Sequence, residues 1–279
     1  NTQEDASNED QSKADEESSI ALQSIEKNVE EKQRTFSVAN EISGMRVNNL
    51  VNPYGLETSN IHFSWQSSIK QSAYRIVISK SKNDINTQKF DFDSGWISND
   101  DMTNIKVNYN FSKDSIYYWM VQLRGSNGSK TNFSNVQSFS TEVSNVWSNQ
   151  GIWSSGNDYA FFRYSANIQK SGIDKAVLTA TALSPEETRS YVYDLYVNGN
   201  SVGMGPTRND SGNLYYDSYD VTGYLNDGNN VLAAQCYSEG TKAFMSQLDL
   251  YYVDGTKATI ANTTNDSMWK TLAADGIFG

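Results

Sequence analysis

The stretch YVYDLYVNGNSVGMGPTRNDSGNLYYDSYDVTGYLNDGNNVLAAQCY (Tyr191–Tyr237) decides the fold class of this chain. Its first part alternates residue by residue, which is the period of a β-strand with one buried and one outer face. Asn198-Gly199 and Asp227-Gly228 are typical of the tight turns that join antiparallel strands. The stretch therefore predicts hairpins of a β-sandwich. In DVTGYL, the spacing of Val221 and Leu225 predicts one short helical turn that buries both side chains.

The tyrosines of this stretch occupy both faces of the predicted strands, and three interpretations of the outer ones remain open. They fill the core, pack against a neighbouring domain, or stack on sugar rings. Arg208 is the best polar candidate for a sugar hydroxyl or carboxylate, because it directly precedes the Tyr215 and Tyr216 pair. Trp153 lies between the two predicted domains, either exposed or packed between them. We predict Arg208, Tyr215, Tyr216 and Trp153 as candidate carbohydrate contacts.

The rest of the chain after residue 40 repeats the period of two. Upstream, six short segments alternate and are separated by polar breaks: FSW (63–65), AYRIVIS (73–79), FDFDSGW (90–96), IKVNYNF (105–111), YYWMVQLRG (117–125) and NVQSFST (135–141). Several short strands in about a hundred residues are typical of a sandwich. Asn127-Gly128 predicts a hairpin. From Ala160 onward the strands return and predict a second sandwich, a jelly roll.

Residues 1–40 differ in composition from everything that follows. They hold ten acidic against four basic residues, and no glycine or tryptophan. The first half carries too little apolar surface to offset the entropy lost on folding. The second half places Ile20, Ile25 and Val29 near helical spacing. We expect an acidic leader with a marginal helix.

The predicted architecture is therefore all-β, with two antiparallel β-sandwiches in tandem after the leader. We expect the leader at 1–40, the first sandwich at 41–142, the jelly roll at 143–262 and the start of a further segment at 263–279.

Composition and charge exclude several partners. The net charge is −11 and the sequence pI is about 4.6. Nucleic acid and anionic membranes are recognised by clustered Lys and Arg, and this chain has no basic run. No stretch approaches the ~18 apolar residues of a membrane span. Because the chain starts at Asn1 rather than Met, we expect a secreted or cell-surface bacterial protein.

Residues capable of catalysis or metal binding are few. The single Cys236 lies in an apolar run and predicts a buried small side chain rather than a reactive thiol. The single His62 excludes zinc sites built on several histidines, and no G-x-S-x-G phrase accompanies it. It favours an edge or surface histidine. The DGNN turn (227–230) offers oxygens but lacks the spacing of a calcium-binding loop.

Paired acids are the remaining catalytic option. Glycoside hydrolysis requires two carboxyl groups on either side of one bond. Neighbouring acids occur as Asp91 and Asp93, Asp100 and Asp101, Glu186 and Glu187, and Asp217 and Asp220. In turns and strands such acids are far more often solvated surface groups. We predict no catalytic residue, no metal ligand and no cofactor within this chain.

The sequence resembles the opening modules of bacterial α-L-rhamnosidases. The phrase ISGMRVNNLVNPYGLETSNIHFSWQ (42–66) is similar to the family's L-x-V-N-x-L-x-N-P-x-G-(I/L) … F-S-W segment, and QSAYRIVIS, DSGW and YYWMVQLRGSNG continue in order. LYVNGNSVG, YYDSYDVTGYLNDGNNVL and NTTNDSMWK resemble the next module. The likeness covers about residues 42–270. Two departures are His62, where the family often has Arg, and AAQCYSEGTKAF, which replaces a glycine-rich, tryptophan-containing phrase.

The resemblance implies a fibronectin type III-like module followed by a jelly roll that packs beside a catalytic domain. In that family an (α/α)6 barrel further along the chain carries two catalytic acids, which hydrolyse the rhamnoside with inversion. The implied partners are this C-terminal catalytic domain and, through it, a rhamnose-containing glycan. The alternative is a stand-alone carbohydrate-binding or cell-surface adhesion protein.

Overall fold

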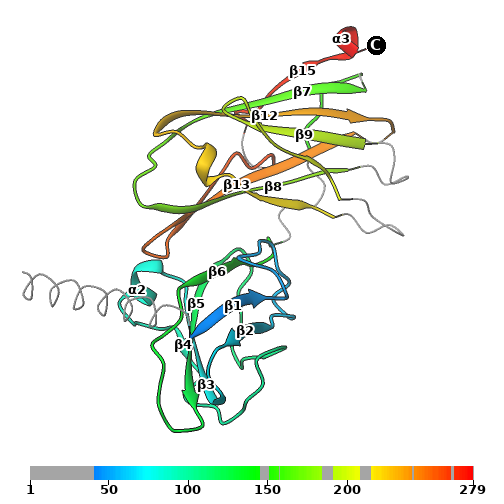
Figure 1. The fold of residues 1–279 in the computed structure, drawn as a ribbon. Coiled ribbons are helices and arrows are strands. Elements are labelled where there is room, and N and C mark those ends of the chain that lie inside the picture. Colours follow the sequence, from blue (N-terminus) through cyan, green and yellow to red (C-terminus); the bar gives the residue numbers. More distant parts are fainter. Residues whose placement is uncertain are drawn as a thin grey trace, which may run out of the picture.

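The computed structural model describes residues 41–144, 151–156, 158–183, 191–207, 215–240, 242–264 and 267–278. The predicted leader, 1–40, lies outside these residues. Figure 1 shows two stacked bodies of β-structure, the first built from the residues drawn in blue to green and the second from those drawn in green to red. All strand pairs in the described residues are antiparallel, so the predicted fold class is confirmed.

The first sandwich consists of a two-stranded sheet against a four-stranded sheet. The smaller sheet pairs β1 (Ile42–Val47) with β2 (Phe63–Ser67). The larger has the order β4-β3-β5-β6, with bounds β3 (Gln71–Ser79), β4 (Phe92–Asp93), β5 (Ile116–Gly125) and β6 (Gln137–Ser140). A short helix, α2 (Lys82–Asn86), follows β3 and is capped by the Ser81 hydroxyl, which accepts from the Asp84 amide at 3.1 Å.

The core of the first sandwich is aromatic, as the alternation predicted. Tyr117, Trp119 and Val121 of β5 face inward and are fully buried. The Trp119 ring meets Phe63 of the opposite sheet edge to face, with centroids 4.8 Å apart. Such pairs add about 0.5–1.5 kcal/mol to the area they bury. The two sheets are thus joined through rings.

One predicted strand of this sandwich is wrong. The segment 105–111 makes only an isolated bridge, between Ile105 and Phe63. Its alternation nevertheless has a physical cause, because Val107, Tyr109 and Phe111 pack onto the core from the sandwich edge. Beyond Ile105, which exchanges two backbone hydrogen bonds with Phe63, period-two burial here reflects an extended chain that lies along the core without a strand ladder in the described residues. The strand predicted at 90–96 is likewise reduced to the two residues of β4.

The second sandwich has a five-stranded sheet over a four-stranded sheet. The first has the order β10-β9-β12-β7-β15 and the second β11-β8-β13-β14. The bounds are β7 (Tyr159–Ile168), β8 (Ile173–Leu183), β9 (Tyr191–Val197), β10 (Asn200–Gly205), β11 (Asp217–Asp220), β12 (Gly228–Ser238), β13 (Ala243–Tyr252), β14 (Lys257–Ile260) and β15 (Lys270–Ala273). The tail of the chain thus adds β15 beside β7 and ends in the one-turn α3 (Asp275–Phe278).

The turns between these strands follow the sequence signals. Asn198 and Gly199 both have positive φ, 51° and 80°, which is the backbone of the type I′ hairpin turn that Asn-Gly favours. The 3₁₀ turn η1 (Thr222–Tyr224) lies between Val221 and Leu225, which are both buried. The Asp220 carboxylate accepts the Thr222 amide at 3.0 Å. The helical turn in DVTGYL is therefore confirmed.

The core of the second sandwich accounts for two of the tyrosines in the opening stretch, and Tyr219 packs on it partly buried. Tyr191, Tyr193 and Leu195 point into it, and Cys236 is 1% exposed among the same side chains. Burial raises the pKa of the Cys236 thiol well above its ordinary value, which keeps it protonated and unreactive. The prediction of a buried small cysteine is confirmed.

Candidate functional site

The predicted carbohydrate contacts that the structure describes, Tyr215, Tyr216 and Trp153, belong to the second sandwich and have different surroundings. Tyr215 is 44% exposed, and its carbonyl accepts from the Thr181 hydroxyl at 2.6 Å. The Tyr216 hydroxyl accepts from the Val143 amide at 3.3 Å, where the chain leaves the first sandwich. Trp153 packs on the core, with its ring 5.6 Å from Phe162. Arg208 lies outside the described residues, so the role of all four in sugar contact stays a prediction.

Most of the paired acids in the described residues hold the fold together. Asp93 forms a two-point ion pair with Arg75, through Nε at 2.8 Å and through Nη2. Asp217 accepts from the Tyr193 hydroxyl at 2.7 Å and from the Thr207 amide at 2.8 Å. Asp101 accepts from the Asn99 carboxamide at 2.9 Å. Glu186 and Glu187 lie outside the described residues.

The pKa values of two of these acids, Asp93 and Asp220, shift in the direction opposite to that of a catalytic acid. A general acid in a glycosidase needs a raised pKa. Burial works to raise the pKa of Asp220, but hydrogen bonds from Thr222 and Tyr54 hold it at about 2. The hydrogen bond from Arg75 lowers the pKa of Asp93. These carboxylates therefore stay ionised and act as hydrogen-bond acceptors and ion-pair partners.

No metal site is formed within the part of the chain that the structure describes. No three His, Cys, Asp or Glu residues gather there in a way that could hold an ion. In the DGNN turn, the Asp227 carboxylate accepts the Lys170 amide at 2.9 Å, and both ends of the Asn230 carboxamide bond the backbone of the turn. Those oxygens are used to shape the hairpin.

A third cluster of buried side chains, with polar contacts around it, lies between the sandwiches. The outer face of β3 and β5 contributes Val77, Tyr118 and Met120, and the outer face of the second sandwich contributes Val177 of β8 and Tyr251 of β13. All five are buried. Sheet faces that would otherwise meet water are therefore covered by the neighbouring module, as Figure 1 shows for β13 and β8 above β5 and β6.

Tyr118 and Asp174 form the first polar contact across this interface. The Tyr118 hydroxyl donates to Oδ2 of Asp174 at 2.7 Å, and the Lys82 ammonium of α2 pairs with Oδ1 of the same carboxylate. The Asp174 side chain is only 9% exposed. Burial and this hydrogen bond raise the pKa of Tyr118, so its hydroxyl remains a donor at any physiological pH. Both oxygens of the Asp174 carboxylate, in β8 of the second sandwich, are thus bound by side chains of the first sandwich.

Tyr54 and Asp220 form a second contact across the interface. The Tyr54 hydroxyl donates to Oδ2 of Asp220 at 2.6 Å, and the Lys175 ammonium lies 3.0 Å from the same oxygen. Tyr54 belongs to the loop after β1, in the NPYG part of the segment 42–66 that resembles the rhamnosidase modules. Its ring packs against the same apolar cluster as Tyr118.

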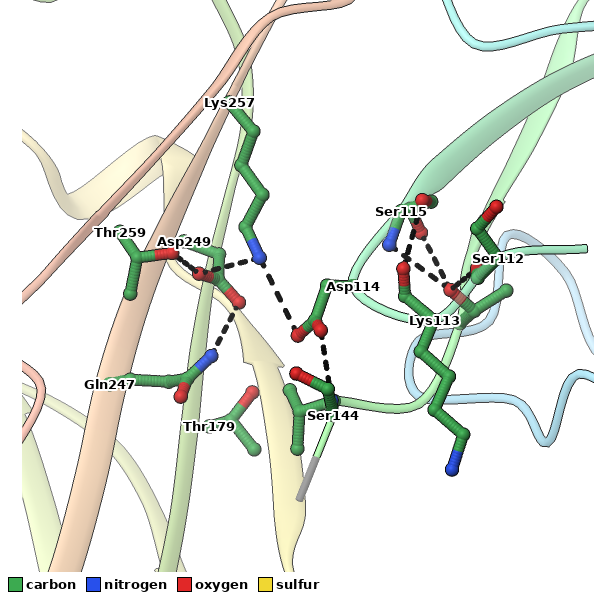
Figure 2. A network of polar contacts seen from close by, with 12 residues as sticks. Ser112, Lys113, Asp114, Ser115, Ser144, Thr179, Gln247, Asp249, Lys257 and Thr259 are labelled. Carbon is green, nitrogen blue, oxygen red and sulfur yellow. Dashed lines mark hydrogen bonds and ion pairs between the residues drawn. The ribbon is translucent and has the colours of Figure 1, made fainter. Parts of the chain in front are cut away.

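A lysine between two carboxylates makes the third contact, shown in Figure 2. The Lys257 ammonium lies 3.0 Å from Oδ1 of Asp249 and 3.6 Å from Oδ1 of Asp114. Asp249 is in β13 of the second sandwich, whereas Asp114 precedes β5 of the first. The Asp249 side chain is 1% exposed and also accepts from Thr259 at 2.5 Å and Gln247 at 2.9 Å. One cation therefore neutralises a buried acid and links the two modules.

Backbone contacts complete the interface at α2. The Asn83 amide donates to the Val253 carbonyl at 2.9 Å, and the Ser81 hydroxyl donates to the same carbonyl at 3.1 Å. Gly255, in the turn after β13, has φ of 89°, and a Cβ there would lie 3.2 Å from the Cβ of Ser81. The turn therefore approaches the helix more closely than a larger residue would allow without movement.

The sequence pattern did not identify the residues of this interface. The signal that was available is that YYWMVQLRG and AFMSQLDLYY carry large or apolar side chains on both faces of their strands. An isolated sandwich leaves the outer face to water, and such strands then alternate apolar with polar. The burial of Tyr118, Met120 and Tyr251 in addition to the inward residues indicates a second packed layer.

Comparison with known proteins relates the first sandwich to one family of domains. Residues 42–145 match the family model described as the Rha78A-like, N-terminal immunoglobulin domain. Immunoglobulin and fibronectin type III domains share the sandwich architecture, so this agrees with the predicted first module. No curated protein matches the chain in sequence.

Solved structures share the fold of both sandwiches. An α-L-rhamnosidase from Dictyoglumus thermophilum superposes with a TM-score of 0.66 at 22% identity, over 85% of this chain and 30% of its own. An α-L-rhamnosidase from Aspergillus terreus gives 0.53 at 19% identity, over 84% of this chain and 29% of its own. The chain thus spans less than a third of either structure. Together with the family match, these likenesses confirm the resemblance to the N-terminal modules of α-L-rhamnosidase-type proteins.

Proposed function

We propose that this chain is the non-catalytic N-terminal portion of a secreted bacterial α-L-rhamnosidase-like glycoside hydrolase, because residues 42–145 match the family model of the Rha78A-like, N-terminal immunoglobulin domain. In this proposal the two sandwiches support an (α/α)6 catalytic domain further along the parent protein. The parent hydrolyses a rhamnose-containing glycan, and these modules contribute structure and contact with carbohydrate.

The observation that carries the proposal is the interface between the sandwiches. Two modules joined by a flexible linker present no fixed surface to a third domain. Here an apolar cluster, the Tyr118–Asp174 hydrogen bond and the Lys257 bridge hold the second sandwich against the first. Interdomain contacts of this kind favour a fixed orientation when they bury apolar side chains. Such an orientation suits a structural support for a catalytic domain.

The placement of the acids supports the non-catalytic part of the proposal. Asp93, Asp217 and Asp220 each bond neighbouring side chains of the fold, and the pKa of Asp220 is held at about 2. A carboxyl group whose pKa is lowered in this way, as that of Asp220 is, does not carry the proton that a leaving glycoside requires. No helix within the described residues has the length and apolar character to cross a bilayer.

The test uses the parent open reading frame. The parent protein and a variant lacking residues 1–262 are assayed on an aryl α-L-rhamnoside after incubation at increasing temperature. We expect the parent to be active and the deletion to lose activity at lower temperature. A deletion that does not fold gives the same loss, so a Tyr118→Phe, Lys257→Met parent is compared as well; it keeps both modules and is expected to inactivate earlier than the parent.

Two results contradict the proposal. One is a parent reading frame that ends soon after Gly279 or continues into a wall-anchoring signal, which favours the adhesion alternative. The other is a parent whose inactivation temperature is unchanged by both the deletion and the interface variant.

A further inference from the structure

A polar pocket of about 490 Å³ opens on the first sandwich at the start of β2. Its lining is dominated by carboxamide and hydroxyl side chains: Asn48, Asn49, Asn60, His62, Phe63, Ser64, Thr103 and Asn104. Small-molecule sites in proteins commonly have volumes of about 300–1,000 Å³. The pocket is therefore large enough for one or two sugar rings.

The local sequence builds the pocket from asparagines in the left-handed backbone region. Asn48, Asn49 and Asn104 have φ of 50°, 66° and 56°, a conformation that asparagine adopts more readily than most residues. The Asn48 carboxamide then joins the two walls. Its oxygen accepts the His62 amide at 2.8 Å, and its nitrogen donates to the Asn60 carbonyl at 2.7 Å. The Asn48 side chain thus fixes the segment after β1 to the backbone at residues 60 and 62.

His62 organises the side chains at the pocket mouth. Its Nε2 lies 2.6 Å from Oδ1 of Asn60, and its Nδ1 contacts Oδ1 of Asn104. A neutral imidazole carries one N–H, so it donates to one of these carboxamides and accepts an N–H from the other. Beyond the His62 ring, neither the Asn60 nor the Asn104 carboxamide has another partner within the described residues, so each keeps at least one N–H donor for a ligand. The Asn49, Ser64 and Thr103 side chains also keep their donors and acceptors available there.

The chemistry of this lining selects a neutral, hydroxyl-rich ligand. Apart from His62, no acidic or basic side chain lines the pocket. An anion finds no Lys or Arg, and a cation finds no carboxylate. A calcium ion is usually held by several carboxylates, which are missing from the lining. Carboxamide and hydroxyl side chains both donate and accept hydrogen bonds, and so do the hydroxyl groups of a sugar. The lining is therefore complementary to a sugar.

We propose that this pocket is a binding site for a neutral saccharide on the first sandwich. The inference deepens the proposed function, because it assigns the carbohydrate contact of these modules to named residues. It places that contact on the first sandwich, apart from the four candidates predicted from the sequence. His62 acts as a positioning residue, since it fixes the two carboxamides that face the ligand.

The experiment is a saturation-transfer NMR and calorimetric titration of the full 279-residue chain. The probes are the methyl glycosides of L-rhamnose, D-glucose and D-galactose, with D-glucuronate as the charged comparison. We expect saturable binding of at least one neutral glycoside and weaker binding of D-glucuronate. His62→Ala and Asn104→Ala should each weaken the neutral glycoside at least about tenfold, equivalent to about 1.4 kcal/mol.

Two further variants separate binding from folding. Thr103→Val keeps the shape of an exposed side chain, removes one hydroxyl, and is expected to weaken binding with the same unfolding midpoint as the unmodified chain. Asn132→Ala, which lies at another surface depression, should bind as the unmodified chain does. Absence of binding for all three neutral glycosides, full binding by His62→Ala, or equal binding of D-glucuronate overturns the inference. These experiments measure glycoside binding, whereas the proposed function is tested by the inactivation temperature of the parent protein. The two proposals can therefore fail independently.

Discussion

The hydroxyl of Tyr118, in β5 of the first sandwich, donates a 2.7 Å hydrogen bond to the carboxylate of Asp174, in β8 of the second. Both side chains are shielded from water, and the acceptor is charged. Hydrogen bonds to charged groups are worth about 1.5–3 kcal/mol. This pair therefore links the stability of one module to the presence of the other.

Tyr118→Phe removes only the hydroxyl and is expected to lower the free energy of unfolding by about 1–3 kcal/mol. The reason is that Oδ2 of Asp174 loses its donor while the ring still packs. Urea denaturation of the chain measures the change. Tyr224→Phe is the matched control, because Tyr224 is 38% exposed. Equal effects of the two substitutions would show that the hydrogen bond contributes nothing.

Lys257→Met is expected to destabilise the chain by about 3 kcal/mol, the lower end of the range for breaking a buried ion pair. The lower end applies because Lys257 is 23% exposed. The substitution leaves the buried carboxylate of Asp249 without a counter-charge. Lys89→Met serves as control, since Lys89 is 75% exposed and lies 3.8 Å from Asp84. Adding Asp249→Asn to Lys257→Met should restore part of the loss; no restoration argues against a charge effect.

The stability of the chain should fall in acid through Asp220. Its pKa is about 2 in the folded chain and close to 3.9 when unfolded. A carboxyl group with a depressed folded pKa contributes stability above the unfolded value, and that contribution is lost as the pH falls from about 4 through about 2. Unfolding free energies measured across this range should show a slope that Asp220→Asn reduces. Asp100→Asn is the control, and an identical slope in both variants contradicts the assignment.

Gly203→Ala should destabilise the second sandwich by about 1–3 kcal/mol. A Cβ at Gly203 would lie 2.4 Å from Cε1 of the Tyr219 ring, so the ring has to move. Gly223→Ala is the matched control, because no atom lies within 4 Å of a Cβ there. That substitution is expected to be neutral or stabilising by up to about 1 kcal/mol. Thermal melts of both variants provide the comparison.

The sequence predicted the strands and turns well because their signals are local. The Asn198-Gly199 turn and the inward positions of Tyr193 and Trp119 follow from backbone preference and alternation within a few residues. The exception at 105–111 has the same origin. Alternating burial was correct for Tyr109 and Phe111, but alternation alone does not reveal whether a hydrogen-bonded neighbour exists.

The interface could not be predicted in this way because its partners are distant in sequence. Tyr54 meets Asp220 and Ser81 meets Val253 across 166 and 172 residues. No periodicity connects such positions. The Tyr216 hydroxyl likewise accepts the amide of Val143, 73 residues away, at the junction of the modules, and its predicted sugar contact stays a prediction. The polar pocket was missed for a related reason, since Asn60 and Asn104 meet only at the His62 ring.

Hydrolysis of 4-nitrophenyl α-L-rhamnopyranoside by the purified 279-residue chain, beside the full parent protein, tests the central claim most directly. If these sandwiches support chemistry that takes place in another domain, the parent releases nitrophenol and the chain alone does not. Release by the chain alone, abolished by substituting one of its own carboxylates such as Asp217 or Asp220, would contradict the account.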